Sequence, residues 1–273
     1  MIGAIIGDVV GSVYEFDNIS KKRFKFFCNK CTFTDDTVMT LAVAESIMKC
    51  MEKEGNYNNL MGYAVEWMHK VGLRYPFCGY GGRFFRWMHG YDWSPYNSCG
   101  NGSAMRISAV GDIAKTVDEA KDLAYKLTAI THNHEEGLKG AEAAAVAKVL
   151  LKQGMSKNDV RWYIEKNYYK LDKTLDEYRR ENNGQHGQEI CQVTMPQAFE
   201  CFFEGKDFED VIRNCISIGG DSDTIAAIAG GIAEAYYPIP RWMKRKVKKY
   251  LPRHLKDILG RWEEFVIISE CRA

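Results

Sequence analysis

The sequence predicts an all-α fold in a single compact multi-helix domain over residues 1–273, and three observations support this prediction. Apolar residues recur at helical spacing, alternating strand patterns are scarce, and no strand–helix–strand rhythm or internal repeat is present. The chain has only 6 prolines, too few for the many turns of a β-sandwich. Hydrophobic residues make up 46% and charged residues 27%, which excludes a disordered tail and indicates a chain that can bury a core.

The first predicted helix carries Gly3, Gly7 and Gly11, which lie on one face because residues four apart stack along a helix. Glycines let another backbone approach closely, so we expect this helix to be central and tightly packed. Residues 38–51 place their apolar side chains on roughly one side, and residues 136–152 are rich in Ala and Leu, which favour helices. The same reasoning predicts helices over 118–130, 156–167, 207–217, 223–237 and 240–250, and one short strand at Glu263–Ser269.

Charge and cysteine content limit the function classes. The 37 basic and 36 acidic residues give a net charge of +1, which excludes a protein whose whole surface is a polycation built for nucleic acid. The basic run 241–249 is interpreted as a solvated helix face in preference to a site for a phosphate-rich partner. Nine cysteines, an odd number spread along the chain, do not indicate a disulfide framework, so we expect a reducing, cytoplasmic location.

Two further features are interpreted as ordinary. Cys28 and Cys31 form a lone C-x2-C, and without a second pair they are interpreted as two thiols rather than as a zinc site. The apolar N-terminal segment has no basic region and is interrupted by Asp8, so we expect neither a signal peptide nor a membrane span.

Two predicted helices each begin with a pair of carboxylates, in Thr34–Asp36 and in Asp221–Thr224. Capping a helix needs one carboxylate, and neighbouring carboxylates repel unless a cation or protons intervene. The second of these helices is almost wholly apolar, so we expect its start to lie near the core, and no Lys or Arg adjoins either segment. Oxygen ligands suit Mg²⁺, Mn²⁺ or Ca²⁺. The residues alone leave capping and metal binding as alternatives.

Glycine-rich segments at 79–82 and 98–106 precede or interrupt helices, and their backbone N–H groups could bind phosphate. A simple turn is the alternative for each segment. His132 and His134 follow a predicted helix, where a cap or a packed side chain is more common than a metal ligand.

The order of these motifs resembles that of the ADP-ribosylglycohydrolase family. The matching pieces are GDVVGSVYEF (7–16), FTDDT (33–37), GYGGR (79–83), GNGSAMR (100–106), THNH (131–134) and GGDSDT (219–224). The resemblance implies an all-α fold with two Mg²⁺ ions, or Mn²⁺ in their place, at the base of a cleft. The ligands that it implies are Thr34, Asp35, Asp36, Asp221, Asp223 and Thr224. The substrate contacts that it implies are Gly79, Tyr80, Gly81, Ser98, Cys99, Gly100, Asn101, Gly102, Ser103 and His132.

The resemblance also implies an activity: hydrolysis of the glycosidic bond between ADP-ribose and a protein side chain or a small acceptor. Glu15 matches a family glutamate near the scissile bond and is the first candidate for the general acid or base. Asp35 and Asp36 are the second candidates for that role. Gly79–Gly81 lacks the acidic neighbour expected in the branch that resembles dinitrogenase reductase-activating glycohydrolase, and Cys99 stands where an aromatic residue would be unsurprising. Serine-linked and other O-linked substrates are therefore favoured, with the arginine linkage still open.

Two other functions stay open at this point. One is a catalytically silent relative that binds ADP-ribose or serves a structural role, and the other is an all-α metal-dependent nucleotide phosphohydrolase. The expected partners are ADP-ribosylated proteins or ADP-ribosyl small molecules. Nucleic acid and membranes are not expected partners, although ADP-ribosylated nucleic acid stays open as a substrate.

Overall fold

The protein is all-α in its computed structural model, which describes residues 1–182 and 187–271, so the predicted fold class is confirmed. The helices are α1 (Ile2–Gly11), α2 (Asp35–Glu54), α3 (Leu60–Gly72), α4 (Gly82–His89), α5 (Gly102–Met105), α6 (Ser108–Ile113), α7 (Val117–Thr128), α8 (Glu135–Lys152), α9 (Lys157–Asn167), α10 (Leu175–Asn182), α11 (Cys191–Glu204), α12 (Phe208–Ile218), α13 (Ser222–Ala233), α14 (Arg241–Val247) and α15 (Arg253–Cys271). In this described part of the chain the only β pairing is a single bridge between Gly100 and Ile190.

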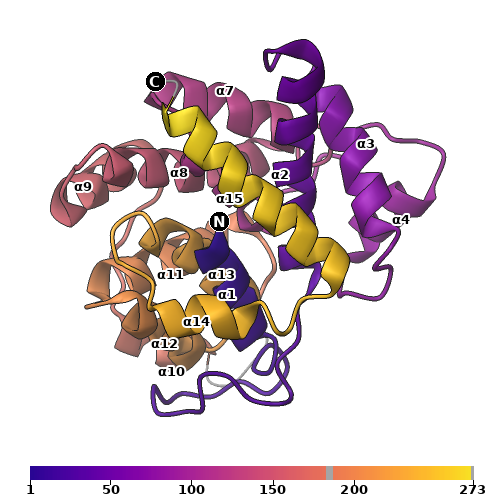
Figure 1. Ribbon diagram of the computed structural model, residues 1–273. Coiled ribbons are helices and arrows are strands. Elements are labelled where there is room, and N and C mark those ends of the chain that lie inside the picture. Colours follow the sequence, from indigo (N-terminus) through magenta and orange to yellow (C-terminus); the bar gives the residue numbers. More distant parts are fainter. Residues whose placement is uncertain (183–186, 272–273) are drawn as a thin grey trace.

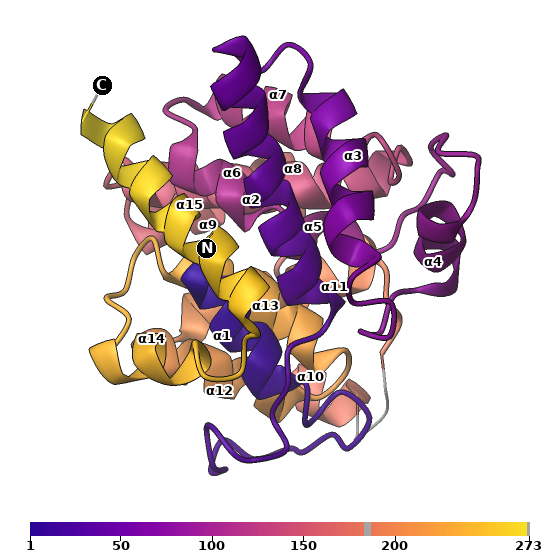
Figure 2. The ribbon, with the colours of Figure 1, turned by 45° about the vertical axis from the view of Figure 1, so that its right-hand side comes forward.

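Helix α1 lies against α13 at the centre of the molecule, as its glycine spacing predicts (Figures 1 and 2). A side chain at Gly3 or Gly7 would collide with the backbone carbonyl of Gly230 or Ala226, so these two helices pack backbone to backbone. Gly11 continues the contact, because a Cβ there would lie 2.8 Å from the amide nitrogen of Asp223. The close contact therefore brings the C-terminal half of α1 to the start of α13.

The remaining helices surround this pair and share one continuous apolar core. Helix α2 packs against α3, α7 packs against α8, and α15 crosses the front of the molecule diagonally (Figure 1). Arg261 ties α15 to α2 through a bidentate ion pair, with Nη1 3.0 Å and Nη2 2.7 Å from the two carboxylate oxygens of Glu45. Among the described residues, no helix combines the length and the apolar character that crossing a membrane requires.

The predicted strand at Glu263–Ser269 is wrong, because these residues belong to α15. The local run of β-branched residues suggested a strand, but Leu255, Ile258, Leu259 and Trp262 recur at helical spacing and are all buried. Helix formation is cooperative, so a packed helix extends through a neighbouring segment whose own preference is weaker. Ile267 and Ile268 are then left exposed on the far side of the helix.

Every predicted helix is present, with ends that shift by a few residues. Helix α13 stops at Ala233 rather than 237, and α14 spans Arg241–Val247 of the predicted 240–250. The sequence patterns do not predict α3, α4, α5, α10, α11 or α15, and α11 contains Pro196. The nine cysteines are all free thiols.

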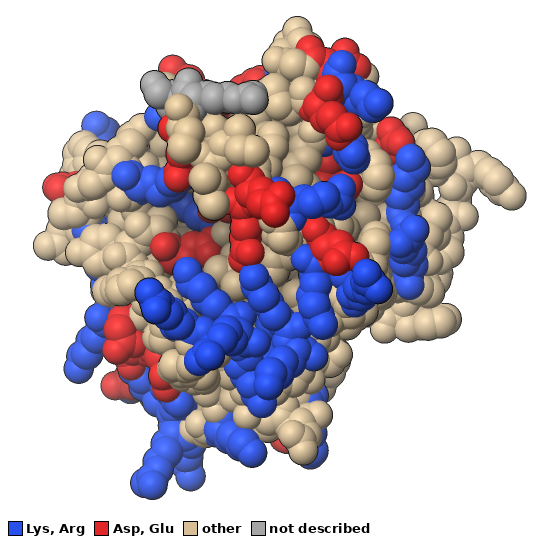
Figure 3. All heavy atoms as spheres, viewed as in Figure 1, with Lys and Arg blue, Asp and Glu red and all other residues tan. Residues whose placement is uncertain are grey.

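The basic run on α14 is exposed to solvent. Met243 and Val247 point into the core, four residues apart, while the basic side chains between and beside them stay in solvent. Figure 3 shows Lys and Arg gathered over this helix.

Candidate active site

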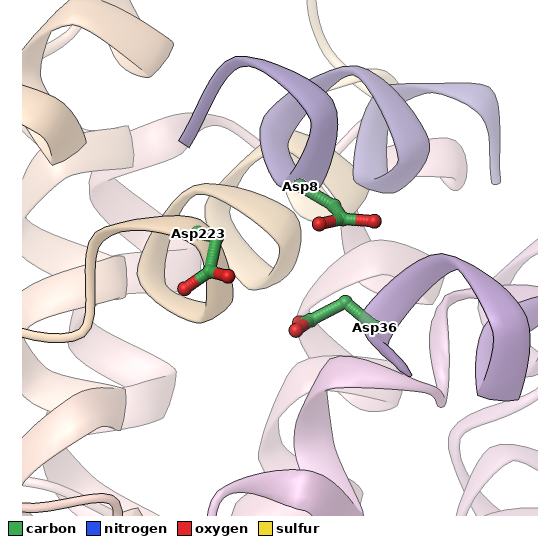
Figure 4. A group of neighbouring side chains, drawn as sticks. All are labelled: Asp8, Asp36 and Asp223. Carbon is green, nitrogen blue, oxygen red and sulfur yellow. The ribbon is translucent and has the colours of Figure 1, made fainter. Parts of the chain in front are cut away.

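Three helices meet where the two predicted carboxylate pairs lie. Asp8 comes from α1, Asp36 from the first turn of α2 and Asp223 from the first turn of α13 (Figure 4). Gly219 and Gly220 precede α13 with φ of +71° and +77°, a backbone conformation that side chains disfavour. These two glycines let the chain turn sharply, so that α13 begins inside the molecule.

The carboxylates form two overlapping groups. Oxygens of Asp8, Asp36 and Asp223 all lie within 4.8 Å of one another, and so do oxygens of Glu15, Asp221 and Asp223. Asp223 therefore belongs to both groups. Figure 4 shows the three side chains of the first group pointing toward a common space between the helices. The structure thus brings the two helix starts together as predicted, and it adds Asp8 to them.

Asp8 holds the start of α2 in place. Its Oδ2 accepts hydrogen bonds from the backbone N–H groups of Thr34 (3.0 Å) and Thr37 (3.1 Å) and from the Thr37 hydroxyl. Its Oδ1 accepts one from the Thr34 hydroxyl at 2.7 Å. These bonds occupy most of the acceptor capacity of Asp8, which leaves little of it free to bind a metal ion. Asp8 therefore adds negative charge to the cluster and positions the first turn of α2.

Burial and mutual repulsion dominate the electrostatics of the cluster. Burial raises the pKa of Asp36 well above its usual range, and Asp8, Asp35 and Asp221 raise it further. The pKa values of Asp35 and Asp223 rise for the same two reasons. Within the described residues, no Lys or Arg forms an ion pair with Asp8, Asp35, Asp36 or Asp223. Such a cluster is stable only with added protons or a cation.

The residues present fit a divalent cation. Asp36 Oδ1 is buried and has no hydrogen-bond partner among the described residues, so one acceptor atom of the cluster is unsatisfied there. Its other oxygen, Oδ2, accepts a bond from the Thr224 hydroxyl (3.2 Å) and lies 3.3 Å from the Thr34 hydroxyl oxygen, whose proton is donated to Asp8. The donor set consists of carboxylate and hydroxyl oxygens, which suits Mg²⁺ or Mn²⁺ rather than a thiol-preferring metal.

A cavity of about 330 Å³ opens above the cluster. Its lining includes most of the residues predicted to contact substrate or metal: Glu15, Asp35, Asp36, Gly79, Gly81, Ser98, Cys99, Gly100, Asn101, Gly102, His132, Asp221, Asp223 and Thr224. Thr34, Tyr80 and Ser103 do not line it. Ser103 donates instead to the carbonyl of Gly100 (3.1 Å), and the buried Tyr80 hydroxyl has no hydrogen-bond partner in the part of the chain that the structure describes.

The glycine loops reach the carboxylates directly. Asn101 Nδ2 donates to Asp221 Oδ2 at 2.6 Å, and it also contacts the Thr194 hydroxyl at 2.9 Å. The amide of Asp35 donates to the carbonyl of Cys78 at 2.7 Å, and the next residue, Gly79, has φ +97°. Both loops are thus fixed to the cluster and form the cavity wall beside it.

One wall of the cavity carries cationic and imidazole groups. Arg106 is 1% exposed, and no carboxylate in the described part of the chain pairs with it. Burial lowers its pKa to about 10, so the guanidinium stays charged at neutral pH. Burial and the nearby Arg106 and Arg83 lower the pKa of His132, so this imidazole is neutral. His134 is a helix cap, with Nδ1 accepting from the amide of Glu136 at 3.1 Å.

Sequence reasoning missed Asp8, Arg83 and Arg106 as site residues. Each stands inside a segment that was singled out, namely 7–16, 79–83 and 100–106. A buried Asp inside an apolar glycine-rich helix is a detectable signal, because an isolated buried carboxylate is costly without partners. The arginines carry no such signal, since their burial depends on helices that are distant in sequence.

Fold and site together define an all-α protein with a buried acidic cluster beneath a glycine-lined cavity. A family model, ADP-ribosylglycohydrolase, matches residues 1–266, and the chain belongs to this family. The relatives include the ADP-ribosylhydrolase ARH3 of Mus musculus, 26% identical over 87% of this chain and 82% of that protein. The ADP-ribosylarginine hydrolase Tri1 of Pseudomonas putida is 22% identical over 90% of this chain and 72% of its own. A solved structure described as an ADP-ribosylglycohydrolase-related protein complex has the same fold, with a TM-score of 0.63 and 21% identity over 91% of this chain and 93% of its own.

Proposed function

We propose that this protein hydrolyses the glycosidic bond between ADP-ribose and an acceptor, with two divalent cations, Mg²⁺ or Mn²⁺, in the carboxylate cluster. One observation carries the proposal. The buried carboxylates of Asp36 and Asp223, which form no ion pair with a Lys or Arg among the described residues, lie at the floor of a cavity whose walls are glycine loops, Arg106 and His132. A diphosphate needs N–H and guanidinium donors, whereas ribose hydroxyls need oxygen acceptors or a cation. The cavity offers both kinds of group, and family membership supports the same substrate.

The proposed ligands are Thr34, Asp35, Asp36, Asp221, Asp223 and Thr224. Divalent cations would supply positive charge that neutralises these carboxylates and polarises the reacting sugar. Asp8 orients this set by holding the Thr34 hydroxyl and the first turn of α2. Asn101 orients it from the other side through its bond to Asp221.

Glu15 is the proposed general acid or base, because it lines the cavity and lies beside Asp221 and Asp223. Cleavage builds positive charge on the ribose C1″ and negative charge on the leaving acceptor. A carboxyl group at this place can take a proton from an attacking water or give one to the acceptor. Asp35 and Asp36 are the second candidates.

The glycine loops are the proposed contacts for the diphosphate and its ribose. Gly79, Gly81, Ser98, Cys99, Gly100, Asn101, Gly102 and His132 line the cavity and would contact the ligand. Tyr80 and Ser103 would support these loops from behind, Ser103 through its bond to Gly100. The physiological substrates would be ADP-ribosylated proteins or ADP-ribosyl small molecules. The free thiols support a reducing compartment such as the cytoplasm.

The test is release of ADP-ribose from arginine-, serine- and nucleobase-linked substrates, with and without Mg²⁺. Mg²⁺-dependent release from at least one of them is expected, and the preferred substrate then identifies the linkage. Tight ADP-ribose binding with no turnover would identify a silent relative instead.

A further inference from the structure

Arg106 and His132 line one wall of the cavity, and the side chain of Thr131 behind them joins the two into a hydrogen-bonded chain. Arg106 Nη2 donates to the Thr131 hydroxyl oxygen at 2.7 Å, and this oxygen lies 2.8 Å from His132 Nδ1. All three are buried, with exposed fractions of 1%, 0% and 5%. Arg106 follows α5 and Thr131 lies in the turn between α7 and α8, and α5 packs against α8, so this hydrogen-bonded chain is a product of the fold.

The positions of the protons in this chain follow from counting donors and acceptors. A guanidinium can only donate, so the Thr131 oxygen accepts from Arg106. The Thr131 hydroxyl has one proton, and among the described residues the only acceptor within its hydrogen-bond distance is His132 Nδ1. A buried hydroxyl without an acceptor is costly, so Thr131 donates to Nδ1. His132 Nδ1 is then unprotonated, and the ring proton resides on Nε2.

His132 Nε2 lies on the glycine-loop side of the ring. A Cβ added at Gly102 would be 3.3 Å from Nε2, and one added at Gly100 would be 3.5 Å from it. His132 and both glycines line the cavity. The Nε2–H group is therefore a hydrogen-bond donor presented to a ligand between these loops.

We propose that Arg106 and Thr131 are positioning residues that fix His132 as an Nε2–H donor for an oxygen of the ligand. Given the proposed function, that oxygen belongs to the diphosphate or the ribose beside it, so this part rests on that function. The tautomer itself does not depend on the function. A phosphate or hydroxyl oxygen accepts a bond from Nε2–H, whereas the opposite tautomer would present a second acceptor and repel it.

Histidine ¹⁵N NMR of the whole protein tests the tautomer, with the His132 signal assigned by its loss in His132→Gln. The expected result is the Nε2–H tautomer at neutral pH, and the Nδ1–H tautomer or an equal mixture would overturn the proposal.

Thr131→Val should mix the tautomers and weaken ADP-ribose binding by about tenfold, the equivalent of one ordinary hydrogen bond. Thr131→Ser keeps the hydroxyl and should restore both readouts. Restored folding without a restored tautomer would contradict the positioning role. Wild-type protein with the Nε2–H tautomer but no affinity for ADP-ribose would refute the proposed function alone.

A second inference comes from a surface outside the cavity, which we call the basic surface. It consists of the exposed Lys and Arg residues of three adjoining parts of the chain, namely the segment 17–31, α14 and the turn that follows α14. These residues are Lys21, Arg23, Lys25, Lys30, Arg241, Lys244, Arg245, Lys246 and Lys249. None of these forms an ion pair within the described residues, whereas Lys22 and Lys248 pair with Asp210 and Glu263. Figure 3 shows the Lys and Arg side chains gathered over α14, and Figure 1 places the segment 17–31 beneath it.

Aromatic contacts join the two parts of the basic surface. The Trp242 ring lies 6.1 Å from Phe26 and 6.0 Å from Phe27, and Phe27 stacks on Tyr250 at 5.7 Å. The Tyr250 hydroxyl donates to the carbonyl of Cys28 at 3.0 Å. Along the chain, the segment 17–31 lies between Glu15 and Thr34, two of the proposed site residues. The balanced net charge of the chain conceals this local excess of positive charge.

We propose that the basic surface binds the phosphate backbone of a nucleic acid. Unpaired cations spread over two adjoining segments match a ligand with repeated phosphates, and a single ADP-ribose has only one diphosphate. A lipid surface fits less well, because Met243 and Val247 of α14 are buried and cannot enter a bilayer. Trp242 is 44% exposed, which leaves part of its ring available for a base to stack on.

Fluorescence anisotropy with a labelled 20-nucleotide single strand, titrated at salt concentrations from about 50 to about 200 mM, tests this proposal. The triple variant Lys244→Glu, Arg245→Glu and Lys246→Glu should bind at least tenfold more weakly. The slope of log binding constant against log salt concentration should become about 2 smaller in magnitude, since each lost phosphate contact removes about 0.7. The matched control is the triple variant Lys53→Glu, Lys115→Glu and Lys166→Glu. It makes the same charge change at exposed lysines that form no ion pair with other described residues, and its affinity should stay within about twofold of wild type. Equal losses in both variants would overturn the proposal. So would binding to polyglutamate or phosphatidylserine vesicles in the absence of binding to the oligonucleotide.

Discussion

Asp223→Asn should abolish the stabilisation of the protein by Mg²⁺, because Asp223 is the carboxylate shared by the two acidic groups. A ligand present at 100 times its dissociation constant stabilises the folded state by about 2.7 kcal/mol. Each kcal/mol raises Tm by about 2–4 °C in a protein of this size, so one ion should raise Tm by about 5–10 °C. Two ions should give about twice that rise. Asp36→Asn alters only one of the two acidic groups, so this variant should keep about half of the rise in Tm caused by Mg²⁺.

The same substitution should have the opposite effect without metal. Burial and the neighbouring carboxylates raise the pKa of Asp223, which means that its ionised form destabilises the metal-free fold at neutral pH. An amide of the same shape removes that charge. We therefore expect the chelator-treated Asp223→Asn protein to melt above the chelator-treated wild type.

The assay is thermal unfolding after EDTA treatment, followed by titration with Mg²⁺ and Mn²⁺. Asp118→Asn is the control, because Asp118 also lies in the first turn of a helix, α7, but is exposed. The reasoning is refuted if Asp223→Asn keeps the full Mg²⁺ shift, or if Asp118→Asn loses it to the same extent.

Three further outcomes are expected. Glu15→Gln should slow turnover by ~10²–10⁴-fold, the usual contribution of a general acid or base. The rise in Tm caused by Mg²⁺ at the group that contains Asp8 should persist in this variant. Turnover near the wild-type rate would assign proton transfer to another group. Gly102→Val should weaken ADP-ribose binding in calorimetry and leave Mg²⁺ binding intact, because its side chain would fill the space beside His132; equal loss of both would identify a structural turn. Burial raises the pKa of Asp112, but Lys148 and the N-terminal amine of Met1 together lower it below its usual range, so the ionised carboxylate stabilises the fold at neutral pH. The unfolding free-energy difference between wild type and Asp112→Asn should be constant from pH 7 to 5 and shrink as pH falls below about 4; a difference that grows at acid pH would contradict this.

Features set by spacing along one helix could be predicted from the sequence. Gly3, Gly7 and Gly11 occupy one face whatever surrounds them, so close packing of α1 followed directly. The carboxylates at the starts of α2 and α13 could likewise be recognised from the sequence as candidate site residues, because two charges at each helix start exceed what capping needs. Their meeting in space was indicated by the resemblance to the family.

Features that depend on tertiary contacts could not be predicted in this way. Asp8 acquires its role from Thr34 and Thr37, which are 26 and 29 residues away. Arg106 meets Thr131 across 25 residues, and nothing local to either residue indicates that contact. The error at 263–269 has the same origin, because packing of the preceding turns of α15 decides the conformation of a segment whose own composition favours a strand.

Mass spectrometry of an ADP-ribosylated acceptor peptide after reaction tests the central claim most directly, since it shows which bond is cut. Glycosidic cleavage predicts intact ADP-ribose and an unmodified peptide, formed with Mg²⁺ and not after chelation. A peptide that retains a phosphoribosyl group, with AMP as the other product, would show cleavage of the diphosphate and contradict the account.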